Sequence, residues 1–421
     1  MRILFLNTSE SKGGAAIAAK RLMNSLQKEG IDVSMMVRDK ATADPSVIKI
    51  RSSKWLNKIR FTYERLGIFI QNGFNRENLF TVSQANTGRD ISRYSEVKCV
   101  DVIHIHWINQ GFLSLKDICR LVAIGKPIVW TMHDMWPCTG ICHHARDCTS
   151  YTSQCGSCFF LQSRKAHDLS TVVFRKKQQW IFYNQNITMV GCSKWLAEKA
   201  KTSALTKRHH VVSIPNPIDV QQFKSHIDKR GCRRQLGLPE HKQLILFGAA
   251  NVTDKRKGIY YLIEAIDRLL AVDPFLAEKV GIVVFGEVKA EFVSLLKIPV
   301  YPLGYVSDVG QIVVLYNAID VFVTSSLEEN LPNTIMEAMA CGVSCVGFHI
   351  GGIPEMIDHK ENGYVALYKD ADDLARGIDW VLNKADREKL SFNARKKVEE
   401  NYSEAVVAKQ YIDLYCSLLK R

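Results

Sequence analysis

The sequence contains no long uninterrupted apolar run. No stretch of about 18 apolar residues lacks charged side chains, and Met1 to Asn7 lacks the extended apolar segment of a secretory signal peptide. Short-period repeats and low-complexity tracts are absent as well. These absences argue against a membrane-spanning or exported chain, so we expect a cytoplasmic protein that starts on a β-strand.

Acidic residues are scarce in the first half of the chain. Residues 1–216 carry 31 Lys and Arg against 15 Asp and Glu, whereas the remainder carries 25 against 28. The net charge of +13 therefore originates in the first half. A basic surface attracts nucleic acid, acidic lipid headgroups or lipid pyrophosphates, although it can also serve solubility alone.

The length and composition allow two globular domains. The chain has 421 residues, and its apolar fraction of 47% is ordinary for a globular protein. Pro215 to Asp219 follows an expected strand at 211–214, and its two prolines stiffen a connection rather than continue a sheet. We therefore predict a first domain over residues 1–214 and a second over 215–403, each with alternating strands and helices.

The first domain opens with a strand, a glycine-containing loop and a helix. A strand over 3–7 leads through Gly13 and Gly14 into a helix over 15–28. These glycines allow a ligand to approach the backbone where the helix begins. The Gly-x-Gly-x-x-Gly fingerprint is absent, and a plain tight turn explains the spacing equally well.

Three histidines lie near the carboxyl ends of two further predicted strands. In the strand over 101–107, alternation sends His104 and His106 to the same side. The strand over 127–133 delivers His133 and Asp134 to its carboxyl end. A single histidine there is most often structural, but two strands bearing them make a functional site a reasonable hypothesis.

A cysteine-rich segment follows His133. Five of the twelve cysteines fall within residues 138–158, and the last two are spaced Cys-x-x-Cys. The thiols can be reduced side chains in a packed loop, a disulfide in oxidised preparations, or ligands of a structural zinc ion. The zinc hypothesis assigns Cys142, Cys148, Cys155 and Cys158 as ligands, with Cys138 or His143 as alternates.

Residues 51–80 mix basic residues with aromatic and aliphatic ones. A basic helix with such a face can lie at a membrane surface, but it can also pack on the sheet as an ordinary helix. The sequence leaves both interpretations open.

The second domain opens in the same way as the first. A strand over 244–248 leads to Lys255, Arg256, Lys257 and Gly258, and an amphipathic helix follows. Three cations at the start of a helix suit a diphosphate because fixed positive charge offsets charge on a leaving group. A solvated basic turn is the alternative.

Residues 324–352 contain a second candidate site. An apolar strand over 318–324 precedes a loop with Glu329, and Pro332 suits the first turn of a helix that Gly342 ends. Glu337 lies about a turn and a half into that helix, so we expect both carboxylates to face one crevice. Ligands of doubly wound sheets bind at the carboxyl ends of the strands, and a helix N-terminus favours a diphosphate.

This stretch resembles the signature of the retaining glycosyltransferases of family four. The resemblance rests on Glu329, the seven residues that follow it, and Glu337 within Glu-Asn-Leu-Pro-Asn-Thr-Ile-Met-Glu-Ala-Met-Ala-Cys-Gly. It is strongest from Lys257 to Glu355 and weaker over residues 30–100. It implies the GT-B fold: two doubly wound Rossmann-like domains facing a cleft, with a C-terminal helix over 404–421 that crosses back to complete the first domain.

The resemblance also implies roles for residues of the donor side. Glu329 would contact the donor sugar, Glu337 would hold the ribose, and Lys257 would bind the diphosphate. The family usually carries an arginine near Ala250 or Asn251, so Arg256 or Lys255 would have to replace it.

Further positions of the chain match the family. Asn330 and Leu331 belong to its donor-binding motif, and Tyr305 and Val306 resemble its base-recognition edge.

On the acceptor side, His133 corresponds to the family's catalytic histidine close to the reacting sugar, and Gly13 and Gly14 to the loop that faces acceptor and donor phosphate.

The resulting prediction is a retaining glycosyltransferase with a UDP- or GDP-sugar donor and no cofactor required for catalysis. The acceptor would be a glycan or an acceptor linked to polyprenyl diphosphate. The reaction would belong to capsular, exo- or lipopolysaccharide synthesis. The inner face of the cell membrane is a candidate peripheral location, and an anionic membrane surface a candidate partner. Two alternatives remain: a sugar-nucleotide 2-epimerase of the same fold, and a nonenzymatic protein that binds nucleic acid or anionic surfaces.

Overall fold

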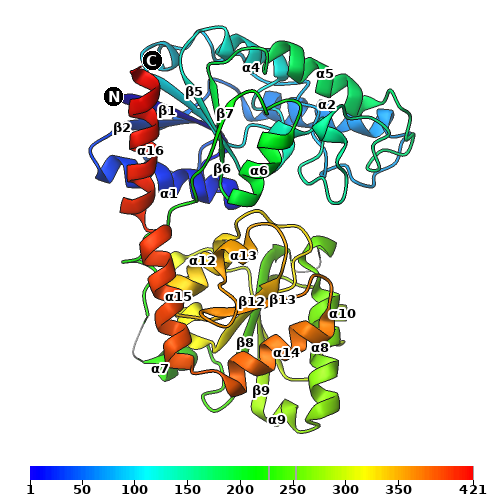
Figure 1. Cartoon of the computed structure of the whole chain (residues 1–421), viewed down its shortest axis with the longest axis vertical. Helices are drawn as coiled ribbons and strands as arrows, with labels where there is room; N and C mark the ends of the chain where they lie inside the picture. Colours follow the sequence, from blue (N-terminus) through cyan, green and yellow to red (C-terminus); the bar gives the residue numbers. More distant parts are fainter. Residues whose placement is uncertain (226–227, 252–253, 421) are drawn as a thin grey trace. The chain divides into compact units, whose positions relative to one another are not determined.

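The computed structural model describes residues 1–225, 228–251 and 254–420, without the side chains of residues 250, 251 and 290. The chain forms two compact units, Met1–Pro217 with Glu404–Arg421, and Ile218–Ser403. The predicted boundary, after residue 214, lies a few residues before the observed one. Each unit is built on one parallel sheet (Figure 1).

The first unit contains a seven-stranded sheet in the order β3-β2-β1-β4-β5-β6-β7. Every neighbouring pair of its strands is parallel. Continuous burial of the central strands on both faces explains their β-branched and aliphatic sequences. The strands are β1 Arg2–Ser9, β2 Asp32–Asp39, β3 Val47–Lys49, β4 Val102–Ile105, β5 Ile128–Met132, β6 Ile187–Gly191 and β7 His210–Ser213.

Helices connect these strands as crossovers. The two sides of the sheet bury separate apolar clusters, one with helix α1 and one with α4 and α5. The helices are α1 Gly14–Lys28, α2 Lys54–Gln71, α3 Ser95–Lys98, α4 Leu115–Val122, α5 Leu169–Trp180 and α6 Lys194–Thr202, with short 3-10 turns η1 Trp136–Cys138 and η2 Ser150–Thr152.

The second unit contains a six-stranded parallel sheet in the order β10-β9-β8-β11-β12-β13. In both sheets the first strand is central and the strand order reverses beside it, which defines a doubly wound fold. The strands are β8 Gln243–Asn251, β9 Val280–Glu287, β10 Val300–Gly304, β11 Val321–Thr324, β12 Cys345–Phe348 and β13 Gly363–Ala366.

The second unit's helices lie on both faces of this sheet (Figure 1). They are α7 Lys229–Gln235, α8 Ile259–Val272, α9 Leu276–Lys279, α10 Ala290–Val293, α11 Val309–Ala318, α12 Asn333–Ala340, α13 Ile353–Met356, α14 Ala371–Asp379 and α15 Arg387–Asn401, with the 3-10 turn η3 Lys255–Lys257 and the π-helical turn η4 Trp380–Lys384.

The last helix, α16 Glu404–Leu419, belongs to the first unit, as the resemblance implied. Its buried residues, among them Tyr411 and Tyr415, join the apolar cluster that holds α1. Ser25 and Lys28 of α1 both bond to the Glu404 carboxylate, at 3.3 Å and 2.5 Å. The C-terminal segment therefore completes the first domain.

Helix α2 packs in an unusual way. Its buried residues are Asn57, Glu64, Arg65 and Ile68, while the aromatic and aliphatic side chains of the helix mostly face outward. The interpretation of α2 as an ordinary helix that packs its apolar face on the sheet is therefore wrong.

The inverted packing of α2 has a local cause. Glu64 and Arg65 form a buried ion pair at 3.1 Å. Glu64 also accepts the backbone N–H groups of Gln84 and Ala85, at 3.2 Å and 3.0 Å. Arg65 donates to the backbone carbonyl of Val82 at 3.0 Å. A buried charge is retained only when it is paired and hydrogen-bonded in this way.

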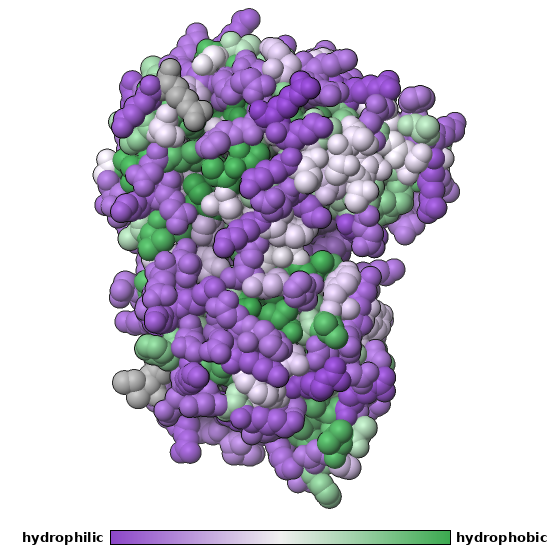
Figure 2. All heavy atoms as spheres, in the orientation of Figure 1, coloured by the Kyte–Doolittle hydropathy of each residue, from purple (hydrophilic) through white to green (hydrophobic). Residues whose placement is uncertain are grey.

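No helix in the described part of the chain is long and apolar enough to cross a bilayer. The face of the molecule in Figure 2 is mostly hydrophilic, with apolar residues in separate groups.

Candidate functional site

In the second unit the strand order reverses between β8 and β11. Ligands of doubly wound sheets bind outside the carboxyl ends of the strands at this position. The loop after β8 carries Arg256 and Lys257, and the loop after β11 carries Glu329. Both predicted motifs therefore meet at one edge of the sheet.

The two loops are joined by an ion pair. The Lys257 ammonium donates to the Glu329 carboxylate, and the side chains are 29% and 16% exposed. The Ser326 hydroxyl donates to the same carboxylate oxygen at 3.2 Å. A partly buried cation and an oriented carboxylate thus lie together at the position where a nucleotide diphosphate is expected.

Gly258 permits this close approach. Its φ is +64°, and a Cβ on it would lie 2.1 Å from the carbonyl oxygen of Ser325. The Ser325 hydroxyl donates to the Gly258 carbonyl at 2.8 Å, and Leu327 N–H donates to the Arg256 carbonyl at 2.7 Å. Only glycine satisfies both the backbone conformation and the lack of space.

Arg256 is held by its own loop. Its guanidinium donates to Asp254 at 2.6 Å and 3.2 Å. Burial alone would lower the pKa of Arg256, but the hydrogen bond and charge of Asp254, followed by the charges of Glu328 and Glu329, raise it above its usual value. Arg256 is therefore a permanent cation beside the site. The family's arginine position, Ala250 or Asn251, lies among residues whose side chains are not described.

The loop after β12 closes against the Glu329 loop. Gly351 has φ +58°, and a Cβ on it would lie 1.8 Å from the Glu329 carbonyl oxygen. Gly352 N–H donates to the Asn330 carbonyl at 2.7 Å. Asn330 and Leu331 are each 7% exposed, so their motif is largely built into the protein.

Helix α12 begins directly after these residues. Pro332 is its N-cap rather than a residue of its first turn, and Glu337 is its fifth residue. Glu337 is 8% exposed and accepts a hydrogen bond from the Tyr316 hydroxyl at 3.2 Å. Burial, and next the charge of Glu337, raise the pKa of Tyr316 well above its usual value, so this hydroxyl stays a donor. Glu337 is thus more enclosed than Glu329.

Tyr305 and Val306 directly follow β10, so they lie at the same edge of the sheet as the loop after β8. Strand β9 lies between β10 and β8. Tyr305 is 74% exposed. Their assignment to base recognition stays a prediction.

In the first unit, the three histidines of the predicted site lie close together. His104 of β4 and His106, just after this strand, stack with ring centroids 4.2 Å apart, which confirms that the two side chains lie on the same side. His106 Nδ1 lies 3.0 Å from His133 Nε2 after β5. His104 is bonded at 2.7 Å to both the Tyr415 hydroxyl and the Thr131 hydroxyl. His104 is therefore a structural residue, and His133 lies at the outer end of the chain of imidazoles.

Burial controls the charge of this cluster. It lowers the pKa of His133 to about 4, against the opposing effect of Asp134, and it lowers the pKa values of His104 and His106 well below their usual range. Burial would raise the pKa of Asp134, but the charge and hydrogen bond of His143 hold it at about 2. At neutral pH the three imidazoles are uncharged and Asp134 is ionised.

Asp134 was not assigned a role from the sequence. Its carboxylate accepts hydrogen bonds from His143 Nδ1 at 2.7 Å, from the Trp107 indole at 3.0 Å and from Trp136 N–H at 2.8 Å. Its place directly after His133, at a strand end, was the signal that could have found it. It orders the loop beside His133.

The Gly13 loop lies at the same sheet edge as the histidines. Gly13 has φ +90° and immediately precedes α1, and its carbonyl accepts the N–H groups of Ala16 and Ile17 at 3.1 Å. The loop follows β1, which pairs with β4, and β4 pairs with β5. Gly13 and Gly14 and the histidines thus share the carboxyl edge of the first sheet.

Comparison with known proteins agrees with this geometry. Residues 12–222 match the family described as Glycosyltransferase Family 4, and residues 228–397 match Glycosyl transferases group 1. The first match covers half of the chain.

The chain belongs to glycosyltransferase family 4.

Similar sequences carry related names. An uncharacterized glycosyltransferase of Methanocaldococcus jannaschii is 28% identical over 326 residues, which is 75% of each chain. A D-inositol 3-phosphate glycosyltransferase of Corynebacterium aurimucosum is 22% identical over 98% of this chain and 92% of the relative. The N,N'-diacetylbacillosaminyl-diphospho-undecaprenol alpha-1,3-N-acetylgalactosaminyltransferase of Campylobacter jejuni is 35% identical over a segment that covers 29% of this chain and 31% of the relative.

A solved structure of Anabaena HepE in complex with UDP-glucose has a TM-score of 0.63 and 16% identity, covering 99% of this chain and 100% of the other. At this identity the likeness concerns the fold alone, and it confirms the predicted GT-B architecture of two Rossmann-like units. This family 4 member is therefore a glycosyltransferase with the GT-B fold.

The zinc hypothesis for this glycosyltransferase receives no support from the geometry. All twelve cysteines are reduced thiols, and among the described residues no group of three or more His, Cys, Asp or Glu side chains is arranged to hold a metal ion. Cys142 and Cys155 are buried, and burial raises the pKa of Cys155 to about 12 and that of Cys158 to about 11.

The alternate zinc ligands have other partners. His143 bonds to Asp134, and Cys138 lies near Met132, with their sulfur atoms 3.5 Å apart. Zinc at Cys142, Cys148, Cys155 and Cys158 stays a prediction, which metal analysis of the purified protein tests.

Proposed function

We propose that this chain is a retaining glycosyltransferase that moves a sugar from a UDP- or GDP-sugar to a glycan or lipid-linked acceptor. Capsular, exo- or lipopolysaccharide synthesis is the proposed pathway. The observation that carries the proposal is the Lys257–Glu329 ion pair at the switch point of the second sheet.

The proposed donor site divides its work among a few groups. The Lys257 ammonium, the Arg256 guanidinium and the N-terminus of α12 would offset the charge that grows on the departing diphosphate. Because these cations belong to the chain itself, we propose that transfer needs no divalent metal. Glu329 would orient the donor sugar once the diphosphate competes for Lys257.

The remaining donor contacts follow from position. Asn330 and Leu331 would shape the pocket wall under the sugar. Glu337, oriented by Tyr316, would accept hydrogen bonds from the ribose, and Tyr305 and Val306 would pack on the base.

Transfer would pass through a state resembling an oxocarbenium ion. The acceptor oxygen would bond to the anomeric carbon on the face from which the diphosphate leaves, and the diphosphate would take the proton of that hydroxyl. The anomeric configuration would then be retained without a covalent intermediate. The name of the HepE complex supports a UDP-sugar as the first donor to examine.

On the acceptor side, burial makes His133 neutral at pH 7, and its ring nitrogens lie 3.0 Å from His106 Nδ1 and 3.6 Å from Cys192 Sγ. We propose that it orients the acceptor hydroxyl or the sugar, while the Gly13 and Gly14 loop lets a ligand approach the backbone. The Campylobacter relative is named for a diphospho-undecaprenol acceptor, which supports a lipid-linked one here.

Helix α2 supports a peripheral membrane location. Five of its exposed apolar side chains form one stripe at helical spacing: Trp55, Ile59, Tyr63, Leu66 and Ile70. Lys54 and Lys58 are exposed beside this stripe. An apolar stripe flanked by cations matches an anionic lipid surface in both chemistry and charge.

Vesicle sedimentation tests the membrane proposal. We expect binding to phosphatidylglycerol-containing vesicles that weakens as salt rises, and that Trp55→Ala with Tyr63→Ala reduces. Tyr183→Ala is the matched control, because Tyr183 is 59% exposed in the same unit but lies outside α2. Binding that ignores salt, no binding, or equal binding by all variants would remove the proposal.

A thermal-shift screen of nucleotide sugars tests the function itself. A donor that binds the native state raises the melting temperature. Product analysis with the stabilising donor then decides the reaction. Transfer with retained anomeric configuration supports the proposal, whereas conversion of the donor without an acceptor indicates the 2-epimerase.

A further inference from the structure

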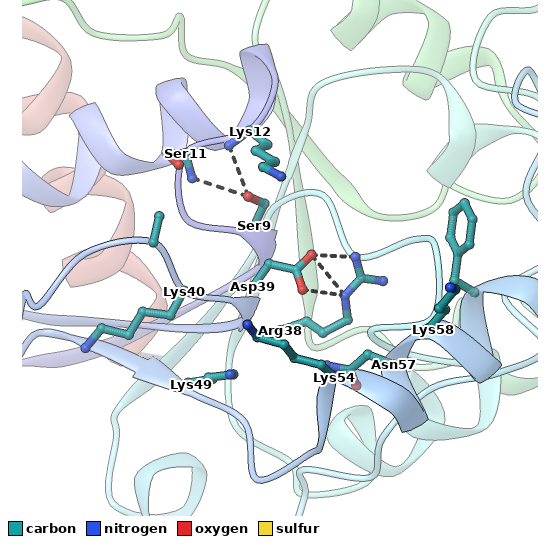
Figure 3. A pocket seen from close by; sticks show the side chains of 12 residues that line it. Ser9, Ser11, Lys12, Arg38, Asp39, Lys40, Lys49, Lys54, Asn57 and Lys58 are labelled. Atoms are coloured by element: carbon teal, nitrogen blue, oxygen red, sulfur yellow. Dashed lines mark hydrogen bonds and ion pairs between the residues drawn. The ribbon is translucent and has the colours of Figure 1, made fainter. Parts of the chain in front are cut away.

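The first unit contains a strongly basic pocket that the proposed donor site does not use. Its volume is about 470 Å³, within the range typical of small-molecule sites. Its walls come from the loop after β1, the end of β2, the end of β3 and the N-terminal half of α2 (Figure 3). Segments far apart in the sequence therefore converge on one cavity.

The charge of the lining is nearly all of one sign. Six basic side chains and one carboxylate line the pocket: Lys12, Arg38, Lys40, Lys49, Lys54, Lys58 and Asp39. The carboxylate is already neutralised, because Arg38 Nε donates to both Asp39 oxygens at 3.1 Å (Figure 3). The pocket thus holds a large excess of positive charge.

Two of the cations are fixed by the backbone. Arg38 also donates to the Gln110 carbonyl, and the Lys40 ammonium donates to the carbonyls of Asp44 and Val47, both at 2.7 Å. These bonds shape the wall of the pocket.

The other four cations lack counterions. Throughout the described ranges, no hydrogen bond or ion pair engages the ammonium groups of Lys12, Lys49, Lys54 and Lys58. Four like charges around one cavity repel one another, and an anion bound among them would relieve that repulsion. Compact ammonium groups suit phosphate oxygens.

We propose that this pocket binds a phosphate or diphosphate ester group. Ser11 and Lys12 of the lining directly precede Gly13, so the pocket adjoins the loop that the proposed function gives to the acceptor. The inference rests on the proposed function in one respect: that function identifies the acceptor as the molecule that carries the phosphate group.

The phosphate group can come from a lipid-linked or a free acceptor. Lys54, Asn57, Lys58 and Phe61 of α2 line the pocket, while Trp55 and Ile59 of the same two turns are exposed. A headgroup in the pocket and an acyl or prenyl chain along α2 would therefore use adjacent faces of one helix.

Calorimetric titration of the full chain tests the pocket, with inorganic pyrophosphate as the soluble probe. We expect the Lys54→Ala, Lys58→Ala double variant to bind pyrophosphate about tenfold more weakly than the wild type, since two ammonium contacts are lost. Lys116→Ala with Lys165→Ala is the matched control, because both lysines are exposed in the same unit and outside the pocket. The control should bind pyrophosphate as the wild type does.

A second arm identifies the source of the phosphate. Farnesyl diphosphate in phosphatidylcholine vesicles is offered to the same variants. Capture of the wild type and the control, but not of the pocket variant, assigns a lipid-linked group. Pocket-dependent binding of pyrophosphate alone assigns a soluble phosphorylated acceptor.

The outcomes separate this inference from the proposed function. Equal pyrophosphate binding by the pocket variant and the control would overturn the inference, even where a nucleotide sugar still stabilises both. Pocket-dependent binding without stabilisation by any nucleotide sugar would support the pocket and count against the donor proposal. Melting curves of all variants verify that they are folded.

Discussion

Replacing Lys257 by alanine should remove most of the transferase activity while leaving the protein folded. The substitution takes away the cation beside Glu329, and Glu329 keeps the Ser326 hydroxyl at 3.2 Å as a partner. Charge-assisted hydrogen bonds contribute about 1.5–3 kcal/mol, and loss of one donor to a developing anion costs a similar amount. About 2–3 kcal/mol corresponds to a fall of about 30- to 150-fold in kcat/KM.

The folding cost should be much smaller. The two side chains are 29% and 16% exposed, so solvent screens much of their attraction. An ion pair of this kind contributes about 0.2–1 kcal/mol to stability. The melting temperature of Lys257→Ala should therefore remain close to that of the wild type.

The assay compares initial rates with the donor found by the thermal-shift screen. Glu329→Ala, Lys257→Ala and the double variant form a cycle, and we expect the double variant to be little worse than either single one, because the two groups act as a unit. Lys389→Ala is the control, since Lys389 is an exposed lysine of the same unit on α15. Near-normal rates for both single variants would refute the assignment of the site.

The remaining predictions concern backbone geometry, pH and the C-terminal helix. Gly351→Ala should lower the melting temperature and donor binding more than Gly237→Ala, because both have positive φ but only Gly351 lacks space for a Cβ. Equal falls in melting temperature for the two variants in differential scanning fluorimetry would contradict this prediction, because they would show that backbone strain alone causes the loss of stability. The free energy of unfolding should fall as pH drops below about 6.5, because burial depresses the pKa of His104 in the native state and the unfolded chain then binds more protons. The expected slope from His104 is up to about 1.4 kcal/mol per pH unit. Urea titrations at pH 7.5 and 5.5 measure this slope, and a flat profile would contradict it. Tyr415→Ala should cost about 3–5 kcal/mol in urea unfolding, since Tyr415 is fully buried, whereas Leu419→Ala on the same helix, at 44% exposure, should cost little.

Much of the fold was predictable because its signals are local. Buried strands such as β1 have short runs of apolar residues, and the strand expected over 3–7 lies within the observed β1. The N-cap of α6 is local as well: serine favours this position, and the Ser193 hydroxyl accepts the Leu196 N–H at 3.0 Å. The short strands β3 and β13 were missed, because β3 has only three residues and β13 begins with a glycine, which is uncommon in strands.

The candidate site was predictable only in part. The motif around Glu329 indicated the family, and the cations before Gly258 indicated a diphosphate. Their contact was not visible, since Lys257 and Glu329 are 72 residues apart and meet only because β8 and β11 are adjacent in the sheet.

The amino-acid sequence by itself determined the alternation of strands and helices, the uneven charge, and the carboxylates and cations of the donor motif, because each depends on neighbouring residues. Only the tertiary structure decided which residues share a site and which face of α2 is buried. Helical periodicity reveals that α2 has two faces, but the buried Glu64–Arg65 pair, with its backbone partners near Val82 and Gln84, selects the inward one. The same packing turns the apolar stripe outward and brings Lys54 and Lys58 to the basic pocket.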